Sequence, residues 1–318
     1  MVGSQPGAGE TEFKARQRMP LEQYRRIIEQ IQGQTSAVSL YFLGDPLLHP
    51  NVDEMCRIAR DAGLNVHIST NFSFSLTDER IRRLVRSGLT HMTVCVDGLS
   101  QEAYQRTRVG GRIDRVILNL DRVCRFRREY RQCYPRVEVQ YLKFQHNLDE
   151  VAPARRLFEH MGIDQVTEFW GGLENYTDFN PGNYTVFGPK RNRCIPQCFW
   201  AHAGMVVKFD GDVIPCCNYR TGEQYTATDD PRAMGNVFET SLLEVWNSPA
   251  YQDARRFVSN PTIVESEPAL KEHFCYGCPI IFETDVAKHC RRGNKYTYEE
   301  LYTIGPDGRS VRCRTLPP

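Results

Sequence analysis

The sequence contains no apolar run that approaches the roughly 20 residues a helix needs to cross a bilayer. Its first nine residues, MVGSQPGAG, have no apolar core of the kind found in secretory signal peptides. Net charge is also nearly absent, because 40 Lys and Arg residues stand against 39 Asp and Glu residues. This balance indicates neither a nucleic-acid partner nor a membrane partner. We therefore expect a cytoplasmic protein.

Cysteine, in contrast, is plentiful, and 12 cysteines in a long cytoplasmic chain indicate metal ligation rather than a disulfide scaffold. Two cysteines form a tight Cys-x2-Cys turn, and two others flank a predicted hairpin with strands at 206–209 and 213–214 and a type I′ turn at Asp210-Gly211. The predicted ligands are Cys198, Cys216, Cys275 and Cys278, with Cys194, Cys217 and Cys290 in reserve.

Four thiolates in two pairs suit zinc or an iron-sulfur cluster, and the spacing alone does not choose between these metals. The ordinary alternative is a set of buried structural cysteines, since cysteine is among the most buried residue types.

Predicted strands and helices alternate along the first half of the chain. The strands are expected at 38–43, 66–68, 91–96, 137–144 and 165–169, and the helices at 19–31, 51–62, 77–87, 114–131 and 148–161. This order indicates parallel β-α units, and therefore an α/β barrel or an open parallel sheet. The arginine-rich stretch at 122–131 is interpreted as a solvated helix face.

Polar residues and glycines follow the predicted strands. They form the groups Gly44-Asp45-Pro46, Ser69-Thr70-Asn71, Asp97-Gly98 and Gln145-His146-Asn147. Each group is also a plausible turn or helix cap. Their recurrence at the same end of successive strands predicts a site there, because parallel α/β folds carry their chemistry at the carboxyl ends of the strands.

In this order and spacing, the motifs resemble those of radical S-adenosylmethionine (SAM) enzymes with a C-terminal SPASM or twitch-type auxiliary cluster domain. The stretch LGDPLLHP at 43–50 resembles the glycine-rich, acid-proline motif that receives the methionyl amino group. The stretches at 69–71 and 94–98 resemble the ends of the third and fourth strands of that family. The auxiliary pattern is carried by Cys198, Gly211-x4-Cys216, Gly235-Asn236-Val237, Glu244-Val245-Trp246 and Cys275-x2-Cys278.

The resemblance implies an α/β fold: a partial (β/α)6 TIM-like barrel, with its first strand missing from this sequence, and a small Cys-rich α+β auxiliary cluster domain. The expected segments are a loop start at 1–18, the barrel at 19–170, a linker at 171–193, the iron-sulfur domain at 194–290 and an extension at 291–318.

The resemblance also implies a SAM site, with Asp45 acting through its charge and Arg108 reaching the methionine carboxylate. The implied SAM-binding residues are Gly44, Asp45, Pro46, Ser69, Asn71, Asp97, Arg108 and Asn147. The four cysteines would hold one auxiliary 4Fe-4S cluster. The catalytic residues are unknown, and Cys95, Cys290 and Tyr176 are candidates by their chemistry alone.

The implied activity is that of a radical SAM/SPASM-type oxidoreductase or maturase. A SAM-derived 5′-deoxyadenosyl radical would abstract hydrogen from a peptide or from a small molecule such as a sugar or alcohol. The electron donor would be a flavodoxin or a ferredoxin.

The sequence departs from the family at the Cys-x3-Cys-x2-Cys motif, which holds the cluster that cleaves SAM. In the family this motif would lie before the first predicted helix, whereas the first cysteine of this sequence is Cys56. We expect the sequence to begin just after the cluster loop, and a second 4Fe-4S cluster only if upstream sequence encodes that motif. The alternative is a degenerate, non-catalytic relative, or a four-cysteine metal protein that recognises a peptide or a partner.

Overall fold

The computed structural model describes residues 18–42, 44–170, 198–216, 233–273, 275, 300–304 and 310–315. The chain divides into two compact units. The first unit contains a parallel sheet and the helices that follow its strands, and the second contains the helix near residue 25 together with the cysteine-bearing segments after residue 198. Each unit is described by itself.

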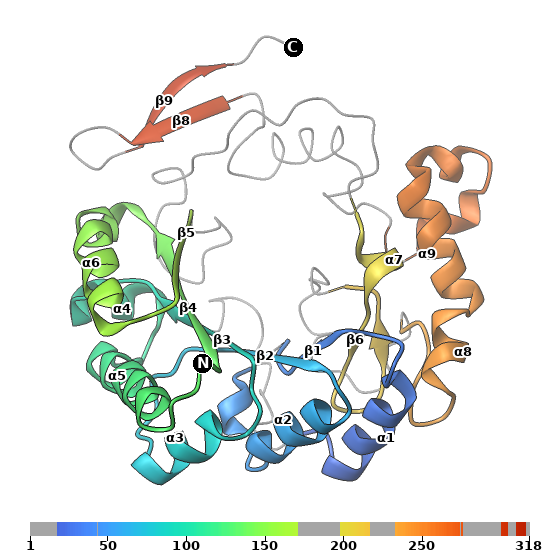
Figure 1. The fold of residues 1–318 in the computed structure, drawn as a ribbon. Helices are drawn as coiled ribbons and strands as arrows, with labels where there is room; N and C mark the ends of the chain where they lie inside the picture. Colours follow the sequence, from blue (N-terminus) through green and yellow to red (C-terminus); the bar gives the residue numbers. More distant parts are fainter. Residues whose placement is uncertain are drawn as a thin grey trace. The chain divides into compact units, whose positions relative to one another are not determined.

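The first unit is built on five parallel strands in the order β1-β2-β3-β4-β5. This sheet confirms the predicted α/β class. Figure 1 shows it as a curved sheet with helices α2 to α6 along its outer side. The strands are β1 (Ala37–Ser39), β2 (Asn65–Thr70), β3 (His91–Val96), β4 (Arg136–Lys143) and β5 (Gln165–Trp170). The helices are α2 (Val52–Asp61), α3 (Asp78–Val85), α4 (Gln101–Thr107), α5 (Ile113–Glu129) and α6 (Val151–Met161), with the 3-10 turns η1 (Pro46–Leu48) and η2 (Gln145–Glu150).

The two faces of this sheet differ in chemistry. Alternate residues of a strand point to opposite faces, and on one face Ile68, Val94 and Val139 are all fully buried. The other face carries half-buried polar side chains, among them His67 and Ser69. The core of the unit therefore lies on one side of the sheet only.

Local capping explains where several helices begin. The side chain of Thr77 accepts a hydrogen bond from the backbone N–H of Arg80 at the start of α3, as an N-cap threonine does. Ser100 caps α4 in the same way through the N–H of Ala103. Helix α4 was not among the predicted helices, because it is short and buries only two side chains, Ala103 and Tyr104.

Strand β1 is shorter than predicted, since it covers Ala37–Ser39 rather than 38–43. The chain leaves the sheet after residue 40 and turns through Gly44 toward η1. The turn is possible because Gly44 has φ +89°, a left-handed conformation that glycine adopts readily. The expected helix at 148–161 likewise starts with the 3-10 turn η2 before α6.

The second unit has its own apolar core around α9 (Pro249–Ser259). Tyr251 and Phe257 of α9 are fully buried there. Helix α1 (Leu21–Ile31) contributes Ile27 to the same core, and the Gln30 side chain accepts a hydrogen bond from the N–H of Leu242 at 2.7 Å. The contacts therefore group α1 with the second unit, although the sequence analysis placed it in the barrel segment 19–170.

This grouping leads to a testable expectation for α1. Replacing Ile27, which is 7% exposed, by alanine should destabilise the second unit by about 2–4 kcal/mol, because a buried methyl-rich side chain is lost and a cavity remains. Native-state hydrogen exchange should then show faster exchange in α9 while β2 to β4 are unaffected. Glu29→Ala on the exposed side of α1 is the control, and faster exchange confined to the sheet would contradict the grouping.

The predicted hairpin is present, with β6 (Val206–Val207) and β7 (Val213–Ile214) antiparallel. Its turn differs from the predicted type I′, which needs a positive φ at both central residues. Gly211 has φ +91°, Asp210 does not have a positive φ, and the N–H of Gly211 bonds to the carbonyl of Lys208. The connection is thus a three-residue loop, a type I turn closed by a left-handed glycine.

The rest of the second unit is made of short elements. Helix α8 (Leu242–Trp246) has Ser241 as its N-cap, and Glu244 completes a capping box. The other elements are α7 (Trp200–Ala203), η5 (Pro261–Glu265) and η6 (Pro268–Glu272). Apart from the elements of the second unit, strands β8 (Glu300–Ile304) and β9 (Ser310–Thr315) pair in a separate two-stranded sheet. Within the described ranges, no helix has the length and apolar character needed to cross a membrane.

Candidate functional site

Asp45 links the loop after β1 to the end of β2. Its carboxylate is 8% exposed and accepts hydrogen bonds from the hydroxyl of Thr70 and from the backbone N–H groups of Leu47 and Asn71, at 2.8–3.0 Å. Burial raises the pKa of Asp45, and these hydrogen bonds oppose the rise. A carboxylate has about four acceptor positions, so this side chain is largely used in holding the loop.

Arg108 links the residues that follow β2 and β3, and it forms an ion pair with the buried Asp97. Asp97 follows β3 and is 1% exposed, and its Oδ2 accepts a 2.6 Å bond from Nε of Arg108 and a 3.0 Å bond from the hydroxyl of Thr107. Nη1 of Arg108 also donates to Oδ1 of Asn71 at 2.6 Å. The guanidinium has five N–H donors, so these two bonds leave donors for a further anion.

The second carboxylate oxygen of Asp97, Oδ1, differs from the other polar atoms of this site in its hydrogen bonding. Oδ1 is buried and has no hydrogen-bond partner among the residues that the structure describes. Buried polar atoms are nearly always hydrogen-bonded, so such an atom calls for an explanation. A bound ligand with a hydroxyl or an ammonium group would provide the missing donor.

Asn147 holds the end of β4 against Asp97. It is fully buried, and Nδ2 donates to the carbonyls of Asp97 and Leu142 at 2.7 and 2.9 Å, while Oδ1 accepts from the N–H of Phe144. Tyr141 donates its hydroxyl to the Asn147 carbonyl at 2.9 Å. These bonds use the whole amide group, so Asn147 fixes the backbone of the site.

Ser69 and Cys95 occupy neighbouring positions on the polar face of the sheet. The Ser69 hydroxyl and the Cys95 sulfur are 3.9 Å apart. Burial raises the pKa of the Cys95 thiol, and the adjacent Arg108 lowers it. The net direction is upward, so the thiol form of Cys95 is favoured.

The fold thus brings the predicted SAM residues to one edge of the sheet. A continuous chain of hydrogen bonds runs through five of them in the order Asp45, Asn71, Arg108, Asp97 and Asn147. Gly44 and Pro46 flank Asp45 in the same loop, and Gly44 has open space where a side chain would begin.

Two side chains support the site in ways that the motifs did not predict, although Thr70 belongs to the predicted group at 69–71. Glu150 of η2 accepts hydrogen bonds from the N–H groups of Leu99 and Ser100, and it therefore anchors the start of α4, the helix that ends at Arg108. Thr70 donates to Asp45. Neither contact could be predicted from local sequence patterns, because each bond joins residues at least 25 positions apart.

Three predicted metal ligands, Cys198, Cys216 and Cys275, lie in the described part of the second unit. Cys275 belongs to its apolar core at 6% exposure, and Cys198 packs against that core. Within the described ranges, no three His, Cys, Asp or Glu side chains form a metal-binding group. The fourth ligand Cys278, the reserve ligands Cys194, Cys217 and Cys290, and the candidates Cys290 and Tyr176 lie outside the described residues.

A buried tyrosine, Tyr251, lies near two of these thiols. Tyr251 is fully buried, and its hydroxyl has no partner among the described residues. Burial raises the pKa of Tyr251, Arg255 opposes this rise, and the nearby Cys216 and Cys275 add to it. Two cysteines distant in sequence therefore lie near one buried hydroxyl. Thiolates together with a hydrogen-bond donor are chemically suited to an iron-sulfur cluster, whose sulfurs accept hydrogen bonds.

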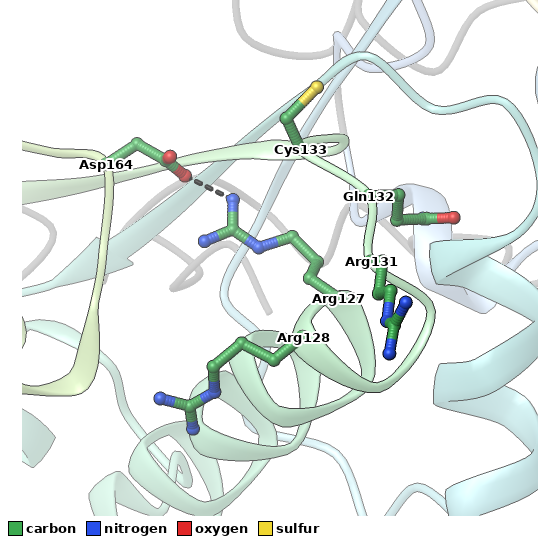
Figure 2. Close-up of a pocket in the computed structure, with 6 residues that line it drawn as sticks. All are labelled: Arg127, Arg128, Arg131, Gln132, Cys133 and Asp164. Carbon is green, nitrogen blue, oxygen red and sulfur yellow. Dashed lines mark hydrogen bonds and ion pairs between the residues drawn. The ribbon is translucent and has the colours of Figure 1, made fainter.

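A cavity lies at the opposite, amino-terminal end of the strands (Figure 2). It measures about 350 Å³ and is lined by Arg127, Arg128, Arg131, Gln132, Cys133 and Asp164. Arg127 is 9% exposed, forms an ion pair with Asp164 and donates to the carbonyls of Pro135 and Gly162. The interpretation of 122–131 as a solvated face is therefore wrong for Arg127, which ties α5 to the start of β5.

Two family models match this chain. The radical SAM superfamily matches residues 5–130, and SPASM, an iron-sulfur cluster-binding domain, matches residues 198–279. The chain is a radical SAM protein with a SPASM domain. Membership in this family implies iron-sulfur clusters and SAM as cofactors, and it confirms the resemblance carried by the motifs at 43–50, 69–71 and 94–98.

Among the relatives of this radical SAM protein, a tungsten-containing aldehyde ferredoxin oxidoreductase cofactor-modifying protein of Pyrococcus furiosus is 23% identical over 76% of each chain. An AdoMet-dependent heme synthase of Methanosarcina barkeri is 27% identical over 31% of this chain and 29% of its own. Among solved structures, SuiB of Streptococcus suis has a TM-score of 0.47 and 17% identity, covering 75% of this chain and 62% of its own.

Proposed function

We propose that this chain binds SAM at the carboxyl-terminal edge of its sheet and holds one auxiliary 4Fe-4S cluster in its SPASM domain. In this role it is an oxidoreductase or maturase that acts on a peptide or a small molecule such as a sugar or alcohol. When bound, SAM supplies a 5′-deoxyadenosyl radical that abstracts hydrogen. The observation that carries the proposal is the buried Asp97–Arg108 pair, with an unpartnered carboxylate oxygen among the described residues and guanidinium donors left for an anion.

The proposed roles follow from which side-chain atoms the fold already uses. Asp45 and Asn147 are occupied by intramolecular bonds, so they position the loop and the backbone, with Asp45 acting on the ligand ammonium through its charge. Arg108 would bind the methionine carboxylate with its remaining N–H groups. Ser69 and Asn71 would lie near the nucleoside.

In the SPASM domain, the proposed cluster ligands are Cys198, Cys216, Cys275 and Cys278. Tyr251 would donate its buried hydroxyl to a cluster sulfur, as hydrogen bonds to sulfur commonly tune such clusters. The electron donor would be a flavodoxin or a ferredoxin. The name of the Pyrococcus furiosus relative, a cofactor-modifying protein, supports a small-molecule substrate.

Binding of SAM by the chain, measured by isothermal titration calorimetry, tests the site. Arg108→Lys should weaken binding by roughly tenfold, the equivalent of one lost charge-assisted hydrogen bond, while the charge beside Asp97 is kept. Binding is the readout because cleavage also needs the Cys-x3-Cys-x2-Cys cluster, whose cysteines are not in the sequence.

Arg106→Lys is the matched control, since Arg106 lies on the same helix and pairs with Glu102 at the surface. It should bind SAM as the unmodified chain does. No binding by the unmodified chain, or equal affinities for the Arg108 and Arg106 variants, would contradict the assigned site.

A further inference from the structure

The concave face of the sheet carries a row of polar side chains that the SAM site does not use. The row crosses all five strands diagonally and is called here the polar row. It consists of Ser39, His67, Thr93, Glu138 and Thr167. Barrels of parallel strands usually fill this side with branched apolar residues. In this unit the apolar residues face the helices, which lie along the other side of the sheet (Figure 1). The concave face is therefore suited to a polar ligand.

Hydrogen bonds connect the members of the polar row in sequence. His67 Nε2 lies 2.9 Å from the Thr93 hydroxyl, and that hydroxyl donates to Glu138 Oε2 at 3.2 Å. Glu138 Oε1 accepts from the Thr167 hydroxyl at 2.5 Å. The strand register makes Thr93 the direct neighbour of Glu138 between β3 and β4. The other two contacts are diagonal, because the direct neighbour of Thr93 on β2 is Ser69 and that of Thr167 on β4 is Gln140.

This arrangement determines the tautomer of His67. Thr93 has a single hydroxyl hydrogen, and it is donated to Glu138, since an ionised carboxylate only accepts. The Thr93 oxygen must then accept from His67, so Nε2 carries the proton. In the neutral ring, Nδ1 is left as an acceptor.

The acceptor nitrogen has only a weak partner within the polar row. Nδ1 lies 3.4 Å from the hydroxyl of the exposed Ser39, at the long limit for a hydrogen bond. The Tyr41 ring meets the imidazole edge-on at 5.1 Å and restricts its orientation. A stronger donor on a ligand would replace Ser39 at this position.

We propose that His67 is a substrate-contacting residue whose Nδ1 accepts a hydroxyl, amine or thiol hydrogen of the substrate. The proposal rests on the proposed function, because His67 lies two residues, or roughly 7 Å along β2, before Ser69 at the SAM edge. If the substrate loses its proton, Nδ1 takes it. Nε2 then passes its proton to Thr93, and the Thr93 hydroxyl passes its own to Glu138, so one proton enters the row and one is held on Glu138.

The electrostatic surroundings keep His67 ready to accept a proton. Burial lowers the pKa of His67, His91 on β3 lowers it further, and Glu138 on β4 raises it. The balance is a pKa below the ordinary value of 6.5, so the ring is neutral at pH 7.

Long-range 1H–15N NMR of histidine-labelled protein tests the tautomer without SAM or a metal. His67 should show a protonated Nε2 and an unprotonated Nδ1 at pH 7.5, and should titrate below pH 6.5. Glu138→Gln should lower the pKa of His67 further, because the carboxylate that raises it is lost. Thr93→Val, which keeps the shape of the side chain, should abolish the preference for Nε2–H. A protonated Nδ1 in the unmodified chain, or no response to either change, would overturn the proposed row.

Carbethoxylation with diethylpyrocarbonate, mapped by mass spectrometry, tests access to Nδ1. His67 should be labelled with a pH midpoint that matches its NMR titration, and Ser39→Ala should increase its labelling. The exposed His91 is the internal reference for reagent activity. Labelling of His91 without His67 would refute the proposal. Because both measurements omit SAM, such a result would leave the calorimetric test of SAM binding unaffected.

Discussion

Replacing Arg108 by methionine should lower the free energy of unfolding of the sheet unit by about 3 kcal/mol or more, because it leaves the Asp97 carboxylate buried without its cation. Asp97 is 1% exposed, and its Oδ1 already lacks a partner among the described residues. Methionine keeps most of the apolar length of the arginine side chain, so the loss reports mainly on charge. Urea denaturation with hydrogen exchange at β2 and β3 measures the effect.

A second substitution separates charge from packing. Asp97→Asn in the Arg108→Met background should recover most of the lost stability, since a neutral amide at this position has no charge to be compensated. Arg106→Met, which breaks an exposed pair with Glu102, should change stability by no more than about 1 kcal/mol. Additive losses in the double variant would show that the two side chains do not depend on each other.

Cys275→Ser should abolish formation of a stable auxiliary cluster. After anaerobic reconstitution with iron and sulfide, the unmodified chain should be brown and the variant nearly colourless, because a hydroxyl is a poor substitute for thiolate at an iron-sulfur cluster. Iron and sulfide analysis, together with the visible spectrum, measures the difference. Cys275 is the most informative position, since it is the buried member of the three described ligands.

Cys124→Ala is the matched control for this experiment. Cys124 is also buried, but it lies on α5 in the sheet unit, where its thiol donates to the carbonyl of Gly162. It should bind as much iron as the unmodified chain. Full iron content in the Cys275 variant would exclude this residue as a ligand, and a colourless unmodified chain with stoichiometric zinc would remove the redox role of the SPASM domain.

The secondary structure was predicted well where local signals act. Strand β3 has the predicted bounds, and the helices α2, α3 and α5 agree with the expected ranges within two residues. Each has a strong apolar period, and Thr77 supplies a cap for α3. The short helix α4 and the three-residue turn at Gly211 were not predicted, because neither has a periodic pattern long enough to identify it.

The structure brings the candidate site residues together, but the bonds that their side chains make were not predicted. Motif order along the chain identified Asp45, Arg108 and Asn147 as site residues. It did not indicate that the side chains of Asp45 and Asn147 are used up in intramolecular bonds. These bonds form only because the tertiary structure places Thr70 beside Asp45 and the Asp97 carbonyl beside Asn147.

By itself, the sequence determined the parallel β-α class and the radical SAM and SPASM motifs, because these depend on periodicity and on short-range spacing. Only the tertiary structure decided that α1 packs with the C-terminal unit and that Arg108 lies between Asp97 and Asn71. The polar row is the clearest case. Alternation along a strand sets which face a side chain takes, whereas the register between strands sets which side chains meet across the sheet.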